Sequence, residues 1–303
     1  MHPSRVTLAE ALPAALFGPR SAPPWIRFAR ILISALLIGI GADQVVSAIR
    51  EWPLHDMDVY LAAAGRIRNG EPLYVAGAAY STYWYAPWFA VLWVPLSYLP
   101  RVAVAIGWSA VLLVATAVIC VRLGRIGPSG LLLALLVGPT LFAVSAGGNV
   151  QALMLLPLLS WPSQRSGPLW VAMAASLKLT PILLVLVYVR GREWWSALLT
   201  VALTAVLVVP GLFVGLLGSQ GTLDWGTSIL GLSPLLYVVS VGLAAASVFV
   251  LPAPIRPLAA ATSAVLALPR LFLYDSTLLC VGTLANHRVG GRSAPATDLT
   301  RTS

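Results

Sequence analysis

Polar residues able to do chemistry are concentrated between residues 52 and 87 of this chain. The stretch holds Asp56, Asp58 and Glu71, three of the ten acidic residues, together with His55 and five tyrosines. A carboxylate held near a hydroxyl can remove its proton as a general base, and tyrosine rings can pack against a sugar or a lipid. This stretch is therefore the first candidate for an active site.

Asp56 and Asp58 are the candidate bases within this stretch. They are two residues apart, so on a helix they do not share a face. They do not form the paired-carboxylate pattern of a hydrolase, but a single carboxylate can serve as the base toward a sugar hydroxyl. Asp56 also has a structural alternative, because a carboxylate at a helix start can cap free backbone N–H groups.

Lys178 is the only lysine of the chain, and it lies near the centre of the apolar run 167–189. A charge at the middle of a membrane costs about 2.5–3.5 kcal/mol on insertion scales, so such a residue usually faces a cavity or a partner. We expect Lys178 to bind a lipid phosphate as a point charge. The alternative is a side chain that extends to the membrane surface.

Two further polar groups interrupt apolar runs. The stretch 147–151 brings the amides of Asn149 and Gln151 together with two glycines, which suits either a binding site or an ordinary tight turn. Arg270 and Asp275 flank the start of the last apolar run. They form either an ion pair at the membrane interface or part of the cavity that the first polar stretch lines.

The composition predicts an all-α polytopic membrane protein. Hydrophobic residues make up 59% of the chain and charged residues 10%, against roughly 25% charge in soluble domains. The net charge of +9 comes from arginines scattered singly at the ends of apolar runs. Nucleic-acid binding needs basic residues clustered on one face, so nucleic acid is not an expected partner. We expect these arginines to contact membrane lipids and set the topology.

Neither a metal site nor a cofactor is predicted from the sequence. The two cysteines, Cys120 and Cys280, both lie within apolar runs, where cysteine usually behaves as a small hydrophobic residue. No cluster of cysteine and histidine has the spacing of metal ligands.

Ten apolar segments predict a bundle of about ten transmembrane helices, since a helix needs roughly 20 residues to cross a bilayer. Several segments are short, which predicts tilted, broken or re-entrant helices around a site within the bundle. The transmembrane domain is expected over 28–286, between cytoplasmic tails at 1–27 and 287–303. The expected spans are 28–48, 86–100, 102–121, 129–146, 149–161, 167–189, 194–217, 234–252, 256–269 and 271–286.

Arginines before the first span place the N-terminus in the cytoplasm and the polar loop 49–85 outside. The same rule puts Arg122, Arg125 and Arg165 on the wrong side of the membrane. Either the middle spans are drawn incorrectly, or these arginines bind anionic headgroups at the outer face.

The outer loop is expected to contain an amphipathic helix over Asp56–Asn69. Apolar residues recur along it at about 3.6-residue spacing, the pattern of a helix lying in the membrane interface. Gly70 and Pro72 suit its C-terminal end. Beyond it, Trp84, Tyr85 and Trp88 are candidates for stacking on a sugar or lipid.

Five segments resemble, in chain order, motifs of the GT-C glycosyltransferases, specifically glycosyltransferase family 87. The family's first-loop signature resembles DMDVYLAAAGRIRNGEPLY at 56–74, and its Tyr-x-Pro segment resembles YWYAPWFAVLWVPLSYLP at 83–100. Its Gly-x-Asn segment is similar to GGNVQALMLLPLL at 147–159, with Gly148 where glutamine is common. The Lys-x-x-Pro helix is similar to SLKLTPILLVLVYVRGREWW, and the C-terminal Pro-x-x-x-x-Tyr-Asp element to LPRLFLYDSTLL.

The resemblance implies a GT-C-like fold and an inverting transferase that needs no metal. Such an enzyme moves a sugar, mannose more readily than arabinofuranose, from a polyprenyl-phosphate donor. The acceptor is a glycolipid or glycan at the outer face of the plasma membrane.

The family pattern has its aspartate four residues before the tyrosine, which matches Asp56 and Tyr60. The resemblance therefore implies Asp56 as the catalytic base, with Asp58 in reserve. Lys178 and Arg270 would hold the departing polyprenyl phosphate. The other residues expected to bind substrate are Tyr60, Tyr85, Asn149, Gln151 and Asp275.

The chain also departs from the family. Its 303 residues are fewer than typical members have, and the loop 218–233 is short. Two alternatives follow. A transporter or flippase of a lipid-linked intermediate predicts charges along a path reaching both membrane faces. A shortened, non-catalytic relative predicts that Asp56, Asp58 and Lys178 are dispensable.

Overall fold

The computed structural model describes scattered positions between 23 and 50, and then residues 54–75, 82–216 and 228–284. Within these ranges the regular elements are helices, and there is no strand. The prediction of an all-α chain is confirmed for this part of the protein. The predicted tails, most of the first predicted span and most of the loop 218–233 lie outside the described residues.

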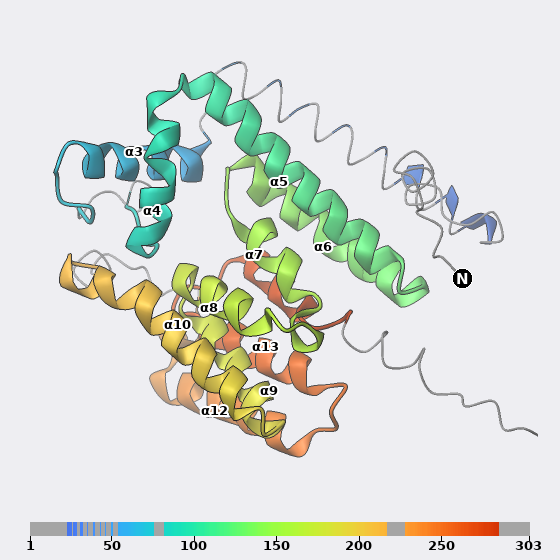
Figure 1. Ribbon diagram of the computed structural model, residues 1–303. Helices are drawn as coiled ribbons and strands as arrows, with labels where there is room; N and C mark the ends of the chain where they lie inside the picture. The colour runs from blue at the N-terminus through green and yellow to red at the C-terminus, as the bar shows by residue number, and fades with distance from the viewer. Residues whose placement is uncertain are drawn as a thin grey trace, which may run out of the picture.

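Three described helices are long and apolar enough to cross a membrane. They are α5 (Arg101–Gly124), α6 (Pro128–Ala146) and α10 (Trp194–Phe213). A tight turn joins α5 to α6, and the two pack side by side along their length (Figure 1). Gly127 has a φ of 123° in that turn, and Pro128 begins α6 where no N–H is needed. The sequence predicted about ten such helices, and in the described ranges the others are shorter or broken.

The predicted span 86–100 is wrong. Its residues form α4 (Pro87–Trp93) and a short 3-10 helix, η1 (Pro95–Tyr98), before α5 begins. Pro95 has no N–H to continue the ladder of α4, and Pro100 separates η1 from α5. Seven residues of α-helix rise only about 10 Å, far short of a bilayer.

The predicted span 167–189 is also wrong as a single helix. Helix α8 (Gly167–Leu177) ends at Lys178, and a 3-10 turn, η3 (Thr180–Leu184), leads into α9 (Val185–Arg190). Pro181 explains the break, because it cannot donate the next helical hydrogen bond and it disfavours helical backbone at Thr180. The first residue of α8 lies against Tyr188 near the end of α9, so α8 and α9 form a hairpin with Lys178 at its apex.

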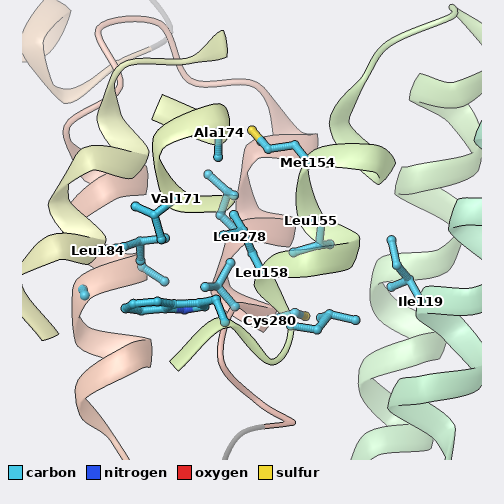
Figure 2. Packing of buried hydrophobic residues seen from close by; sticks show 14 of the residues in the cluster. Ile119, Met154, Leu155, Leu158, Val171, Ala174, Leu184, Leu278 and Cys280 are labelled. Carbon is cyan, nitrogen blue, oxygen red and sulfur yellow. The ribbon is translucent and has the colours of Figure 1, made fainter. Parts of the chain in front are cut away.

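The remaining described elements complete a helical bundle around this hairpin (Figure 1). Their bounds are α7 (Gln151–Leu158), η2 (Trp161–Ser163), α11 (Ile229–Leu232), α12 (Pro234–Val250), α13 (Arg256–Leu266) and η6 (Leu273–Cys280). The large buried core lies where α7, α8 and η6 meet, and Figure 2 shows Leu155, Leu158 and Leu278 within it. It fixes the segments that carry Gln151, Lys178 and Asp275.

A second buried cluster holds α3 (His55–Arg68) against α4 and the start of α5. The buried face of α3 carries Met57, Tyr60, Ala63 and Ala64, which confirms a helix with one apolar face, while its place in the membrane interface stays a prediction. Gly70 follows the helix with a φ of 70°, as expected for a residue that ends a helix in the left-handed conformation.

Four exposed arginines lie at the ends of their helices that point away from α3, whereas Arg68 is exposed on α3 itself. Arg122 and Arg125 are at the far end of α5 from Arg101, whose side chain contacts α3. Arg165 precedes α8 and Arg190 ends α9, so both lie opposite the apex at Lys178. The end of the described bundle opposite α3 therefore carries these four exposed arginines.

Candidate functional site

Asp56 lies in the first turn of α3, directly against the turn that follows α6. Its backbone N–H donates to the Gly147 carbonyl at 2.9 Å, and its Oδ2 accepts a hydrogen bond from Asn149 Nδ2 at 2.7 Å. Leu54 occupies the N-cap position of α3, and no side chain forms a capping hydrogen bond at this helix end. The carboxylate of Asp56 therefore has a partner from another element instead of a capping role.

The stretch 147–151 connects Asp56 to Lys178 through its two amides. Asn149 Oδ1 accepts from the Gln151 backbone N–H at 2.9 Å, which fixes the amide that donates to Asp56. Gln151 Oε1 accepts from Lys178 Nζ at 2.9 Å, and its Nε2 donates to Thr277 Oγ1 at 2.9 Å. This turn thus bridges the candidate base and the candidate cation, and both amides are buried.

Gly148 permits the close approach of this turn to α3. Its φ is 83°, a conformation that residues with a Cβ rarely adopt. A Cβ here would also lie 3.0 Å from the backbone nitrogen and the Cβ of Met57. The Trp108 indole N–H donates to the Gly148 carbonyl at 2.7 Å and holds the turn from α5.

Lys178 is paired with Asp275 across 97 residues of sequence. Nζ lies 2.7 Å from Asp275 Oδ1, and the two side chains are 13% and 1% exposed. The other carboxylate oxygen accepts from the Phe272 backbone N–H at 2.9 Å. Of the two alternatives left open for Arg270 and Asp275, the ion pair between them is wrong, and Asp275 belongs to the same cluster as Gln151.

Arg270 lies between two aromatic rings. Its guanidinium carbon is 4.6 Å from the centre of the Phe272 ring and 5.8 Å from that of Trp84. Among the described residues, neither Arg270 Nε nor Trp84 Nε1 has a hydrogen-bond acceptor, although both nitrogens are shielded from solvent.

Asp58 does not join this cluster. Arg101 donates from Nε and Nη2 to the two carboxylate oxygens of Asp58, both at 2.8 Å. The pair is about one-third exposed, and exposed pairs contribute about 0–1 kcal/mol. The structure thus gives Asp58 a partner that ties α3 to α5, and Asp56 alone faces Asn149.

Tyr60 and Tyr85 are linked to each other, and only Tyr85 is partly accessible. Tyr60 is fully buried among aromatic rings and donates to the Tyr85 hydroxyl at 3.2 Å. Tyr74 donates to the Tyr85 carbonyl at 2.8 Å. Tyr60 is therefore placed to orient Tyr85, and it does not reach a surface on which it could contact a substrate.

Burial raises the pKa of Asp56 above its ordinary value of 3.8. The Asn149 hydrogen bond and the charges of Lys178 and His55 act in the opposite direction but do not cancel the effect of burial. A raised pKa makes this carboxylate a stronger base than an exposed aspartate. Burial, and next the charge of Asp56, also raise the pKa of Tyr85, so its hydroxyl stays protonated.

Several residues of the cluster were not predicted as site residues from the sequence. Tyr274 lies under Lys178, with Nζ 4.3 Å from its ring centre, and Thr277 holds Gln151. Both belong to the LYDST segment, whose polar residues beside an apolar run were the available signal. The described ranges contain no group of three His, Cys, Asp or Glu side chains that could hold a metal ion.

The chain was compared with known protein families, curated proteins and solved structures. No protein-family model, curated protein or solved structure matches the chain.

Proposed function

We propose that this protein is a membrane-embedded inverting glycosyltransferase. It transfers a sugar, mannose more readily than arabinofuranose, from a polyprenyl-phosphate donor to a glycolipid or glycan acceptor. The observation that supports this most is the placement of Asp56, half-buried with a raised pKa and hydrogen-bonded to the turn that also binds Lys178. A base and two cations gathered at one end of a helical bundle suit attack on a phosphate-linked sugar.

In the proposed reaction, Asp56 removes a proton from the acceptor hydroxyl. The acceptor oxygen attacks the anomeric carbon while the bond from that carbon to the phosphate oxygen breaks. The proton ends on Asp56, and the electron pair of the broken bond leaves with the polyprenyl phosphate. Cations beside the phosphate stabilise its growing negative charge.

The two oxygens of Asp56 have different surroundings, which suits this role. Oδ2 accepts from Asn149, so the amide fixes the plane of the carboxylate. Oδ1 has no hydrogen-bond donor in the described part of the chain and can receive the acceptor's proton. A base must lie within hydrogen-bond reach of the proton that it removes, and Oδ1 is the oxygen of Asp56 that would accept that proton.

The distribution of arginines supports an active site on the outer face of the plasma membrane. We assign Arg122, Arg125, Arg165 and Arg190 to one membrane side, because all four lie at helix ends that are remote from α3 or from the hairpin apex at Lys178. The positive-inside rule makes that side cytoplasmic. The cluster at Asp56 then faces outward within a GT-C-like bundle whose shorter helices also enter the membrane.

Purified protein in lipid nanodiscs provides the test, with radiolabelled polyprenyl-phosphate mannose or arabinofuranose as donor. Asp56→Asn should lower the rate of sugar transfer about 100-fold or more, the usual contribution of a general base. Asp58→Asn is the matched control and should stay close to wild type, because Asp58 pairs with Arg101. An Asp56→Asn protein as active as wild type would refute the role of Asp56. Lipid translocation without sugar transfer would indicate a flippase instead.

A further inference from the structure

The ammonium group of Lys178 makes three contacts with the protein itself. Nζ lies 2.7 Å from Asp275 Oδ1 and 2.9 Å from Gln151 Oε1. It also lies 4.3 Å from the centre of the Tyr274 ring, whose face attracts a cation. An ammonium group has three donors, and these contacts account for all three. A lipid phosphate at Lys178 would therefore have to displace one of them.

The two hydrogen-bonded partners of Lys178 are also held within the protein. Asp275 Oδ2 accepts from the Phe272 backbone N–H at 2.9 Å, and Gln151 Nε2 donates to the Tyr274 carbonyl at 3.4 Å. Asp275 is 1% exposed and Gln151 is 0% exposed. A substrate cannot reach either side chain without moving the residues around it.

Tyr274 is the residue that these contacts hold in place. Lys178 lies over its ring, and Gln151 bonds its carbonyl. The Phe272 ring is parallel to it within 8°, with ring centres 5.2 Å apart. Tyr274 is partly exposed, and its hydroxyl has no hydrogen-bond partner within the described ranges. The hydroxyl is therefore a fixed donor that a ligand can use.

This hydroxyl belongs to the surroundings of the proposed base. Tyr274 interacts electrostatically with Asp275, Tyr85 and Asp56. Tyr85 is also partly exposed, and its hydroxyl accepts from Tyr60 and keeps its own proton for another partner. Two phenol groups that can donate thus lie near the carboxylate of Asp56.

The position of these phenols suits the hydroxyls of a sugar. In the proposed reaction the acceptor oxygen lies at Asp56, and the anomeric carbon must approach that oxygen to about 3–3.5 Å before attack. The sugar ring is then next to Asp56 and its neighbours. A phenol can donate to, and accept from, an uncharged hydroxyl of that ring.

We propose that Lys178 is a positioning residue that acts through Tyr274, and that the Tyr274 hydroxyl donates to a hydroxyl of the donor's sugar. The identity of the sugar lipid rests on the proposed function, whereas the contacts that occupy Lys178 do not. Lys178 also acts on Asp56 at longer range, since its charge favours the ionised carboxylate.

The test compares two ligands that differ only in the sugar, and it needs no turnover. Microscale thermophoresis on protein in nanodiscs measures affinity for a short-chain polyprenyl-phosphate mannose and for the same polyprenyl phosphate without sugar. Tyr274→Phe removes the hydroxyl and keeps the ring. We expect it to bind the sugar lipid about tenfold more weakly and the sugar-free lipid as wild type does. Its Tm should not change, because the hydroxyl has no partner in the described protein.

A double-mutant cycle tests whether Lys178 acts through Tyr274. Lys178→Met/Asp275→Leu removes both charges of the buried pair and releases the Tyr274 ring. We expect it to lose about as much affinity for the sugar lipid as Tyr274→Phe does. Adding Tyr274→Phe to this variant should then cost little more, because residues that act as one unit are not additive.

Tyr98→Phe is the matched control for the loss of a phenol hydroxyl. Tyr98 also carries a cation over its ring, with the Arg68 guanidinium carbon 5.1 Å from the ring centre. It is 68% exposed and lies in η1, outside the cluster at Asp56. Tyr98→Phe should bind both lipids as wild type does.

The outcomes separate this inference from the proposed function. Equal binding of the sugar lipid by wild type and Tyr274→Phe would overturn the inference even if sugar transfer were observed. An equal loss of affinity for both lipids in Lys178→Met/Asp275→Leu would show instead that Lys178 binds the phosphate. Losses that multiply in the triple variant would show that Lys178 does not act through Tyr274. A sugar-specific loss in Tyr274→Phe would support the inference even if no sugar were transferred.

Discussion

Asp56 and Asp58 are two residues apart in sequence but have different chemical surroundings. Asp58 receives two hydrogen bonds from a charged guanidinium at the surface, whereas Asp56 is half-buried and receives one from a neutral amide. Burial without a directly bonded cation is what raises the pKa of Asp56. At the scale of single residues, the neighbours decide which carboxylate can act as a base.

Asn149 should set the pH at which Asp56 becomes active. The base must be ionised, so the rate of transfer falls as pH is lowered through the raised pKa of Asp56. The Asn149 hydrogen bond favours the ionised form, and its removal in Asn149→Ala raises that pKa further. We therefore expect the acidic limb of kcat/KM against pH to move to higher pH. Asp58→Asn should leave the limb in place, and a limb that moves to lower pH in Asn149→Ala would contradict the role of Asp56.

Lys178 should stabilise the fold by neutralising the buried carboxylate of Asp275. Lys178→Met leaves a carboxylate that is 1% exposed without its cation, which costs about 3–5 kcal/mol in comparable buried pairs. Lys178→Met/Asp275→Leu removes both charges, so its Tm should be higher than that of Lys178→Met alone. Thermal unfolding in detergent measures the difference, with Asp58→Asn as an exposed-pair control that shifts Tm little. A double variant as unstable as the single variant would show that the ion pair is not the cause.

At the scale of elements, periodicity predicted α3 well and hydropathy predicted the α8–α9 hairpin poorly. The apolar stripe of α3 recurs at helical spacing and packs on one core, so its pattern and its structure agree. Apart from Lys178 the run 167–189 is largely apolar, and its hydropathy gave no sign of a reversal of direction. Pro181 was visible in the sequence, but a proline alone does not distinguish a kinked span from a hairpin. The contact between Gly167 and Tyr188 decides this, and it depends on tertiary packing.

The turn at Gly148 offers a direct test of how elements position the base. Gly148→Ala places a Cβ 3.0 Å from Met57 in a backbone conformation that costs alanine about 1–2 kcal/mol. We expect α3 to shift away from the turn, so transfer activity should fall more than thermal stability does. Gly107→Ala is the matched control, because a Cβ at Gly107 in α5 meets no atom within 4 Å. Loss of activity in Gly107→Ala equal to that in Gly148→Ala would contradict this explanation.

At the scale of the whole molecule, most site residues can be named from the sequence but their pairing cannot. Polar residues are unusual within apolar runs, and this alone indicates Asn149, Gln151, Lys178 and Asp275 as candidates. For Asp275 the same reasoning leaves two alternatives open, an ion pair with the nearby Arg270 or a place in the cavity lined by the first polar stretch. The actual partner of Asp275 is Lys178, which is 97 residues away, and only the packing of α8 against neighbouring elements brings the two together.

Membrane orientation is the property of the whole molecule that the described helices revise most. Because α4 is too short to cross a bilayer, the turn after α5 should be cytoplasmic, and the positive-inside rule assigns Arg165 to the same side. Single cysteines introduced as Arg125→Cys, Arg165→Cys and Glu71→Cys test this, in a background where Cys120 and Cys280 are replaced by alanine. In intact cells, a membrane-impermeant maleimide should label position 71 but not positions 125 and 165 until the membrane is opened. Outside labelling at position 125 would mean that residues 86–100 cross the membrane after all, and the cluster at Asp56 would then need another assignment.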